Sequence, residues 1–217
     1  MIITRCKANS DIDKALKNHR RIVVVGCGLC AATCKTGGEN EVRETARRLS
    51  AGGKEILAEL MVDGVCHKRL LERLSRQERE TVDNADAFLI LACGSGTQTA
   101  AEVFSRPVYA GLDTLFLGQI QRHGEFREVC MLCGDCLLDG DVAICPIARC
   151  PKSLVNGPCG GAEEGMCEVV RENRCVWIEI YEKSTRHGST AGLKKTHPPR
   201  DHSLSLHPGS MVTRKKG

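Results

Sequence analysis

The sequence predicts an α/β fold with a doubly wound parallel sheet, followed by a small loop-rich cysteine domain and an extended basic tail. In the first half, short apolar runs alternate with helical patterns, which is typical of a parallel sheet. Eight of the 14 cysteines then fall between Cys130 and Cys175. From Ser184 onward, core-forming residues almost disappear. The expected parts are a flavodoxin-like, cluster-binding domain (1–118), a cysteine-rich metal domain (119–183) and an extended basic tail (184–217).

The strands of the first domain are predicted from apolar runs bounded by glycine or polar residues. The run RIVVVG is continuous, as expected for a strand that is buried on both faces. The runs EILAELMV and AFLILA have the same character, and a shorter strand is expected after Pro107. The predicted strands are Arg21–Gly26, Glu55–Val62, Ala87–Ala92 and Pro107–Ala110.

Helices are predicted between these strands. In ENEVRETARRLSA, apolar residues recur at Val42, Ala46 and Leu49, and Gly52-Gly53 then ends the pattern. A capping box, Ser10-x-x-Asp13, is expected to start a short N-terminal helix that ends near Asn18. The other predicted helices are Glu39–Ala51, Lys68–Leu74, Glu78–Asn84 and Thr97–Phe104.

The cysteine-rich segment has many turn residues and little apolar surface to bury. Gly134, Gly140, Asp141 and the stretch NGPCGG are examples of its turns. Apolar and polar residues alternate over Cys175–Tyr181, which predicts one strand there. A small segment with a poor core needs another source of stability, and bound metal is one such source.

Composition indicates the compartment and the kind of chemistry. The N-terminal residues contain no continuous apolar stretch and no small-residue cleavage site, and no run of about 18 apolar residues occurs, so a cytoplasmic chain without a membrane span is expected. Many thiols in a cytosolic chain indicate metal binding or redox activity rather than disulfides. We find no Ser/His/Asp set, no Walker loop and no paired carboxylates that would suggest catalysis by this chain.

The positive charge is concentrated in the tail. Residues 184–217 contain seven Lys or Arg and one Asp, which gives +6, so the rest of the chain is −2 within the total of +4. The tail has no aromatic residue that could stack on bases, which argues against nucleic acid. A solvated tail or an arm that docks on a partner subunit is expected.

A first group of cysteines is expected at one edge of the sheet. Three lie in the loop after the first strand, and one follows each of the next two strands. Because residues just past the carboxyl ends of parallel strands meet in one crevice, these thiols suit one 4Fe–4S cluster with one thiol to spare. Half-buried cysteines that act as small apolar residues are the alternative, and Gly26-x-Gly28-x-x-Ala31 also fits a loose nucleotide-binding pattern. The cysteines are Cys27, Cys30, Cys34, Cys66 and Cys93.

A second group fills the cysteine-rich segment. Its opening C-x2-C-x2-C spacing matches the first part of the bacterial ferredoxin pattern, whose last cysteine precedes proline. Eight thiols provide two four-ligand sites, so two further 4Fe–4S clusters are expected, although spacing does not reveal the pairing. Zinc is the competing metal, because four-cysteine zinc sites are common in loop-rich modules. The cysteines are Cys130, Cys133, Cys136, Cys145, Cys150, Cys159, Cys167 and Cys175.

The sequence also resembles a known family. The pattern CxxCxxC…CPxxRCPKSLxNGPCGG…GxCE…CxW spans Cys130–Trp177, GCGxCxxxCKTGGE spans Gly26–Glu39, and ACGxGxQ spans Ala92–Gln98. Together they resemble the small iron–sulfur subunit (MetV type) of methylenetetrahydrofolate reductases, over residues 20–182. In acetogens and related anaerobes this subunit accompanies a separate, flavin-bearing barrel subunit.

The resemblance implies an electron-transfer subunit that binds neither folate nor flavin. Its partner would reduce methylenetetrahydrofolate to methyltetrahydrofolate, and this chain would pass electrons to the partner's flavin, from a donor such as an electron-bifurcating or heterodisulfide-reductase-like assembly. The cysteines would then be cluster ligands and not nucleophiles. A zinc-stabilised structural subunit and a nucleotide-binding oxidoreductase domain are the alternatives.

Overall fold

The structure is a computed structural model that describes residues 1–138 and 142–211. The chain divides into two compact units, Met1–Phe126 and Arg127–Gly217. Five residues that the sequence analysis used lie outside the described part of the chain: Gly140, Asp141, Arg214, Lys215 and Lys216.

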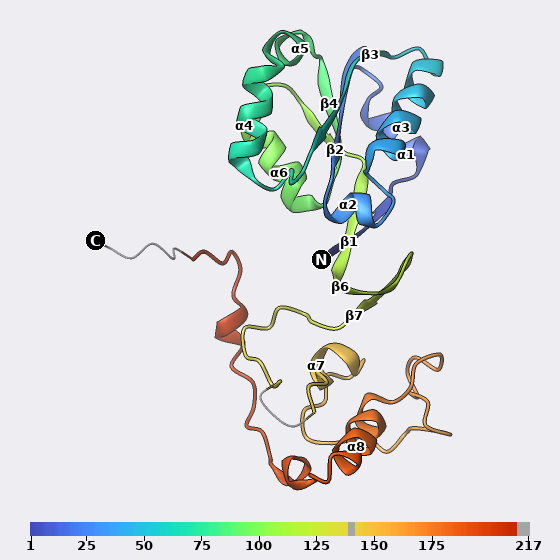
Figure 1. Ribbon diagram of the computed structural model, residues 1–217, viewed down its shortest axis with the longest axis vertical. Helices are drawn as coiled ribbons and strands as arrows, with labels where there is room; N and C mark the ends of the chain where they lie inside the picture. Colours follow the sequence, from blue (N-terminus) through green and yellow to red (C-terminus); the bar gives the residue numbers. More distant parts are fainter. Residues whose placement is uncertain (139–141, 212–217) are drawn as a thin grey trace, which may run out of the picture. The chain divides into compact units, whose positions relative to one another are not determined.

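A four-stranded parallel sheet forms the centre of the first unit (Figure 1). Its two middle strands are the most apolar, and every residue of β4 is buried. A parallel sheet with helices on both faces must bury its middle strands completely. The continuous apolar runs form these middle strands, as expected. The predicted α/β fold class is confirmed. In spatial order the strands are β3 (Glu55–Val62), β2 (Arg21–Cys27), β4 (Ala87–Leu91) and β5 (Val108–Ala110).

Helices cover both faces of this sheet. In Figure 1, α1 and α3 lie on one side of it and α4 and α6 on the other. Helix α3 has the expected bounds and buries Val42, Ala46 and Leu49. The expected capping box is wrong, because Ala8 is the N-cap of α1 and no side chain makes a hydrogen bond there. The helices are α1 (Asn9–Ala15), α2 (Cys30–Thr33), α3 (Glu39–Ala51), α4 (Lys68–Gln77), α5 (Arg79–Asn84) and α6 (Gly94–Val103).

A second, three-stranded sheet was not expected from the sequence. It has the order β1 (Ile2–Cys6), β6 (Leu112–Arg122) and β7 (Glu125–Glu128), and β1 pairs antiparallel with β6. Most of β6 is exposed or half-buried, so it lacks the apolar run that identified the other strands. Because β6 continues past residue 118, the first unit extends beyond the end expected for the first domain.

The second unit contains short helices linked by turns. They are α7 (Pro146–Arg149), α8 (Val176–Arg186) and two 3-10 turns, η1 (Ala191–Lys194) and η2 (His202–Ser205). Among its described residues the buried apolar side chains are Pro146, Ile147, Cys175, Val176 and Ile180, which is a small core.

The strand expected at Cys175–Tyr181 is wrong, since this segment is the start of α8. Helix α8 buries Val176, Ile180 and Ser184, and the spacing of four residues places these side chains on one helical face. Because α8 runs to Arg186, the expected boundary between residues 183 and 184 lies inside this helix. No helix in the described ranges is both long and apolar enough to cross a membrane.

Candidate metal centres

Three cysteines lie at the carboxyl ends of the strands of the parallel sheet. Cys27 is the last residue of β2, Cys66 lies in the turn after β3, and Cys93 is the N-cap of α6, two residues after the end of β4. The backbone N–H of Gly28 donates to the carbonyl of Val62 at 2.8 Å, which joins the cysteine loop to the end of β3. The strand order therefore brings cysteines from separate parts of the sequence to one edge of the sheet.

The Cys66 thiol at this edge lies close enough to three other cysteines to be affected by their charges. Burial raises the pKa of the Cys66 thiol, and the thiolate charges of Cys93, Cys27 and Cys30 raise it further. Thiolates gathered in this way repel one another, so the group is stable in the deprotonated state only when cations lie among the sulfurs. The four residues Cys27, Cys30, Cys66 and Cys93 thus have the residue type of a metal site, but their side chains are not placed around one metal ion.

The fifth expected ligand points elsewhere. The Cys34 thiol is 3.8 Å from the carbonyl oxygen of Ile2 in β1, and the Cys6 thiol is 3.8 Å from the carbonyl oxygen of Thr36. Both cysteines therefore face the contact between the loop and the antiparallel sheet. This leaves Cys34 as the thiol that the four-cysteine group does not use.

Close packing fixes the loop that holds Cys27 and Cys30. The Cys27 N–H donates to the carbonyl of Gly37 at 2.9 Å, and a Cβ at Gly37 would lie only 2.0 Å from the carbonyl oxygen of Leu91 in β4. The Thr36 hydroxyl, buried in the loop, makes a 2.7 Å hydrogen bond with that of Thr4 in β1. The loop is therefore tied to both sheets of the first unit.

The nucleotide-binding interpretation of this loop is not supported by its geometry. A Cβ at Gly26 would lie 2.4 Å from the Val42 side chain, so this glycine is explained by packing. Helix α2, which follows the loop, has only four residues. The first long helix is α3, where the carboxylate of Glu41 accepts a hydrogen bond from the N–H of Gly38 at 2.9 Å. The chain's own carboxylate thus occupies the place that a pyrophosphate would take.

In the second unit, four of the eight cysteines line one cavity. Three are held by backbone hydrogen bonds of 2.8 Å, in which Cys150 donates to Pro146, Cys167 to Asn173 and Cys175 to Gly165. These bonds fix the turns that carry three of the cysteines at the cavity. The cysteines that line this C-terminal thiol cavity are Cys150, Cys159, Cys167 and Cys175.

The lining of the C-terminal thiol cavity is rich in cations. Arg149, Lys152 and Arg174 line it, together with the carboxylate of Glu168. The Cys159 thiol donates to Glu168 at 2.9 Å and Lys152 forms an ion pair with the same carboxylate; these two hydrogen bonds hold the pKa of Glu168 below its usual value. Cations at this position offset the negative charge of thiolates.

One N–H group of the Arg149 guanidinium lacks a hydrogen-bond partner within the described residues. The guanidinium pairs with Glu179 at 2.6 Å, but its Nε is buried and has no hydrogen-bond partner within the described ranges. A buried N–H without a partner costs about 1–3 kcal/mol. An acceptor in the adjoining cavity, such as a metal-bound sulfur, would satisfy it.

The other four cysteines begin the second unit. Cys130, Cys133 and Cys136 lie in a tight loop in which Leu132 and Gly134 both have positive φ, at 55° and 76°. Cys145 is the N-cap of α7. Across residues 1–138 and 142–211, no group of three or more His, Cys, Asp or Glu side chains is placed to hold a single metal ion.

The basic tail is extended and packs against its own unit. The side-chain amide of Asn156 donates to the carbonyl of His197 at 2.9 Å and accepts from its N–H at 2.7 Å. In η2, the carbonyl oxygen of Leu204 would lie 2.5 Å from a Cβ at Gly134, in the loop of the first three cysteines. Part of the tail therefore packs against other residues of the second unit, which the sequence did not predict.

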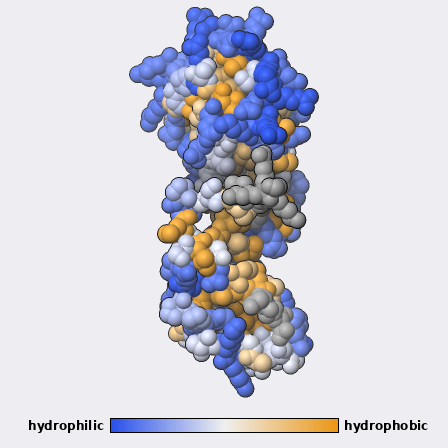
Figure 2. Space-filling view, turned by 90° about the vertical axis from the view of Figure 1, so that its left-hand side faces the viewer, coloured by the Kyte–Doolittle hydropathy of each residue, from blue (hydrophilic) through white to orange (hydrophobic). Residues whose placement is uncertain are grey.

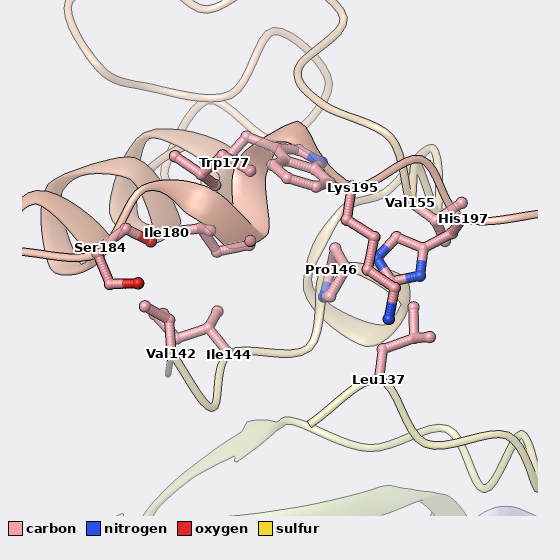
Figure 3. A pocket seen from close by; sticks show the side chains of 13 residues that line it. Leu137, Val142, Ile144, Pro146, Val155, Trp177, Ile180, Ser184, Lys195 and His197 are labelled. Atoms are coloured by element: carbon pink, nitrogen blue, oxygen red, sulfur yellow. The ribbon is translucent and has the colours of Figure 1, made fainter. Parts of the chain in front are cut away.

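The tail also closes one side of an apolar cavity of about 210 Å³ (Figure 3). The floor consists of α8, with Trp177 and Ile180, and of Pro146 from α7; the indole Nε1 of Trp177 donates to the carbonyl of Leu154 at 3.2 Å. Lys195 and His197 of the tail line the cavity beside Pro146. The cavity contains no cysteine, so it is separate from the thiol cavity.

Comparison with known proteins gives one match. Residues 109–203 match the sequence model of a family described as the C terminal of methylene-tetrahydrofolate reductase. The matched range includes all eight cysteines of the second unit. No curated protein and no solved structure was found to match. The chain thus has a domain similar to one associated with a folate-linked oxidoreductase.

Proposed function

We propose that this chain is an electron-transfer subunit of a methylenetetrahydrofolate reductase complex. The observation that carries the proposal is the four-thiol group at the carboxyl edge of the parallel sheet, formed by Cys27, Cys30, Cys66 and Cys93. Four thiols from three strand ends suit the corners of one 4Fe–4S cube. The family match over residues 109–203 supports the association with the reductase.

The remaining ligands divide into two further sets. The thiol cavity supplies one set, Cys150, Cys159, Cys167 and Cys175. By elimination, Cys130, Cys133, Cys136 and Cys145 supply the other. Iron–sulfur clusters in these three sets would supply one-electron transfer, which the side chains of this chain do not perform by themselves.

The surrounding residues would adjust the charge of the clusters. A 4Fe–4S cluster with four thiolates is anionic, and nearby cations and N–H donors stabilise the reduced form and so raise the potential. Arg149, Lys152 and Arg174 are placed for this at the C-terminal thiol cavity. The unpaired Nε–H of Arg149 could donate a hydrogen bond to a sulfur at this site.

Zinc remains a candidate for that cavity, for a specific reason. The space between its walls is about 20 Å³, which is room for one water-sized occupant. A single tetrahedral zinc ion requires less rearrangement of these thiols than a cube does. A zinc-stabilised structural subunit of the same reductase is therefore the second candidate function.

The proposed partner is a flavin-containing barrel subunit that reduces methylenetetrahydrofolate to methyltetrahydrofolate. A larger bifurcating or heterodisulfide-reductase-like assembly is a candidate donor. The basic tail would strengthen the complex, so its removal should make the complex weaker and more sensitive to salt. Because α8 extends to Arg186, the deletion should begin after Arg186 rather than at Ser184, which is buried in α8.

Flavin reduction in the intact complex tests the proposal. A low-potential donor should reduce the partner's flavin through this chain, and Cys93→Ala or Cys136→Ala should abolish that reduction while the complex still assembles. If the flavin is reduced at the parental rate in both variants, the electron-transfer proposal is wrong and the structural subunit is favoured.

A further inference from the structure

A basic face begins next to the four-thiol edge of the first unit. Helix α4 starts two residues after Cys66 and contains Lys68, Arg69, Arg73 and Arg76 against one carboxylate, Glu72, for a net charge of +3. Figure 2 looks onto the α4 side of the first unit, where hydrophilic residues surround an apolar patch. This concentration of charge has no explanation in the packing of the helix.

Three of the arginines form a stripe. Arg69, Arg73 and Arg76 are spaced by four and three residues, which puts them on one face of α4, and all three are exposed. Within the described residues, none of them forms an ion pair with the chain's own carboxylates. We refer to these three residues as the α4 arginine stripe.

Glu102 in α6 pairs with Lys68 and not with the stripe, since its carboxylate lies 2.9 Å from the Lys68 ammonium. Glu72 lies one turn from Lys68 and one turn from Arg76, and it forms no ion pair within the described ranges. The arginine stripe therefore faces solvent with a net positive charge.

The stripe is continuous with the exposed part of the thiol edge. A Cβ at Gly64 would lie 3.5 Å from the Leu29 side chain and 3.9 Å from that of His67, so the cysteine loop and the start of α4 lie together. Leu29 is 56% exposed, and Cys66 is exposed as well. Arg69 is the member of the stripe nearest this edge, and Arg76 lies about 10 Å further along α4.

We propose that the α4 arginine stripe, together with Leu29, is the docking surface for a small acidic electron-carrier protein of the ferredoxin type. The proposal rests on the function proposed above, because it places the carrier beside the Cys27/Cys30/Cys66/Cys93 site. Transient redox partners use small interfaces that are steered by opposite charge, with an exposed apolar contact at the centre. In the transfer, the reduced carrier loses one electron and the iron–sulfur site gains one, with no proton moved.

The test measures binding of an acidic two-cluster ferredoxin, purified from the same organism, to the anaerobically purified full chain. We expect saturable binding that weakens as ionic strength rises from about 0.01 M to about 0.15 M, since the Debye length falls from about 30 to about 8 Å. In the triple variant Arg69→Glu, Arg73→Glu and Arg76→Glu, the association rate at low salt should fall roughly 10- to 100-fold.

Two control variants accompany it. The first control is the triple variant Lys14→Glu, Lys17→Glu and Arg47→Glu, which makes the same change in net charge. Lys14 lies in α1, Lys17 just after it and Arg47 in α3; these helices cover the other side of the sheet (Figure 1), and none of the three residues forms an ion pair within the described ranges. This variant should bind the ferredoxin at nearly the parental rate. The charge-conserving variant Arg69→Lys, Arg73→Lys and Arg76→Lys should do so as well, which separates loss of charge from loss of folding.

Iron and sulfide content and reduction by dithionite distinguish the two proposals. A chain without iron overturns the proposed function and this inference with it. If the charge-reversed stripe keeps its iron and its reduction by dithionite but binds ferredoxin like the parent, the docking surface alone is wrong. If a short single-stranded DNA binds through the same arginines more tightly than ferredoxin does, the stripe is a nucleic-acid site and the inference fails.

Discussion

Gly37→Ala should disturb the first metal centre through packing alone. A Cβ at this position would lie 2.0 Å from the Leu91 carbonyl oxygen and 3.0 Å from the Ala31 Cβ. Leu91 ends the fully buried β4 strand, so the loop must move rather than the sheet. Such overpacking costs typically 1–3 kcal/mol, and the backbone contact puts this site at the upper end.

The net effect can be worked out from two opposing contributions. Alanine also stiffens the unfolded chain, which offsets about 0.5 kcal/mol of the overpacking cost. The remaining destabilisation of about 2 kcal/mol is roughly a 30-fold change in the unfolding equilibrium. For a chain of this size it lowers Tm by roughly 4–8 °C. Because the loop holds Cys27 and Cys30, iron content should fall as well.

Gly64→Ala is the matched control at the same edge of the sheet. Its Cβ would make only ordinary contacts, at 3.5 Å from Leu29 and 3.9 Å from His67. This variant should be as stable as the parent or more stable, by about 0.4–1 kcal/mol. Urea unfolding followed by circular dichroism, with iron analysis, compares the two. Equal stability and equal iron content in the Gly37→Ala chain and the parent would refute the view that this packing fixes the thiol site.

Three further predictions concern metal, pH and the tail. Cys133→Ala should leave the first unit folded but make the second more sensitive to limited proteolysis, because the proposed metal would stabilise its small core; equal resistance of both units in variant and parent would contradict this. The backbone N–H of Arg21, followed by its guanidinium, holds the pKa of Asp86 at about 2. The Asp86 carboxylate therefore stabilises the fold fully above pH 3.8, and this stabilisation is lost as the pH falls through about 2. Urea midpoints of Asp86→Asn should therefore be lower than those of the parent at neutral pH and should converge with them in acid; a constant difference would show that the carboxylate's charge is not responsible. Asn156→Ala removes both hydrogen bonds to His197, so proteolysis within the tail should become faster with iron content unchanged, and an unchanged cleavage rate would mean that the amide does not hold the tail.

The sequence predicted the first unit better than the second because the two units fold by different rules. Buried runs such as RIVVVG have few alternatives, and α3 matched its expected bounds. Strand β6 was missed because its side chains are mostly exposed, and helix α8 was mistaken for a strand because Val176, Ile178 and Ile180 alternate as they would in a strand. Over six residues, period two and period 3.6 are difficult to distinguish.

The same contrast applies to the metal sites. Parallel strands bring residues at their carboxyl ends to one edge, so the grouping of Cys27, Cys66 and Cys93 could be expected from the strand order alone. No such rule governs turns. That Cys150 and Cys175 line one cavity depends on individual backbone hydrogen bonds, which spacing does not specify.

Metal analysis of the anaerobically purified full chain tests the central proposal most directly. The proposal predicts a brown protein with iron and acid-labile sulfide, at about 8 to 12 iron atoms per chain for two or three cubes. Iron near the lower value together with one zinc would assign zinc to one C-terminal site, most simply the thiol cavity. Stoichiometric zinc without iron would contradict the electron-transfer function.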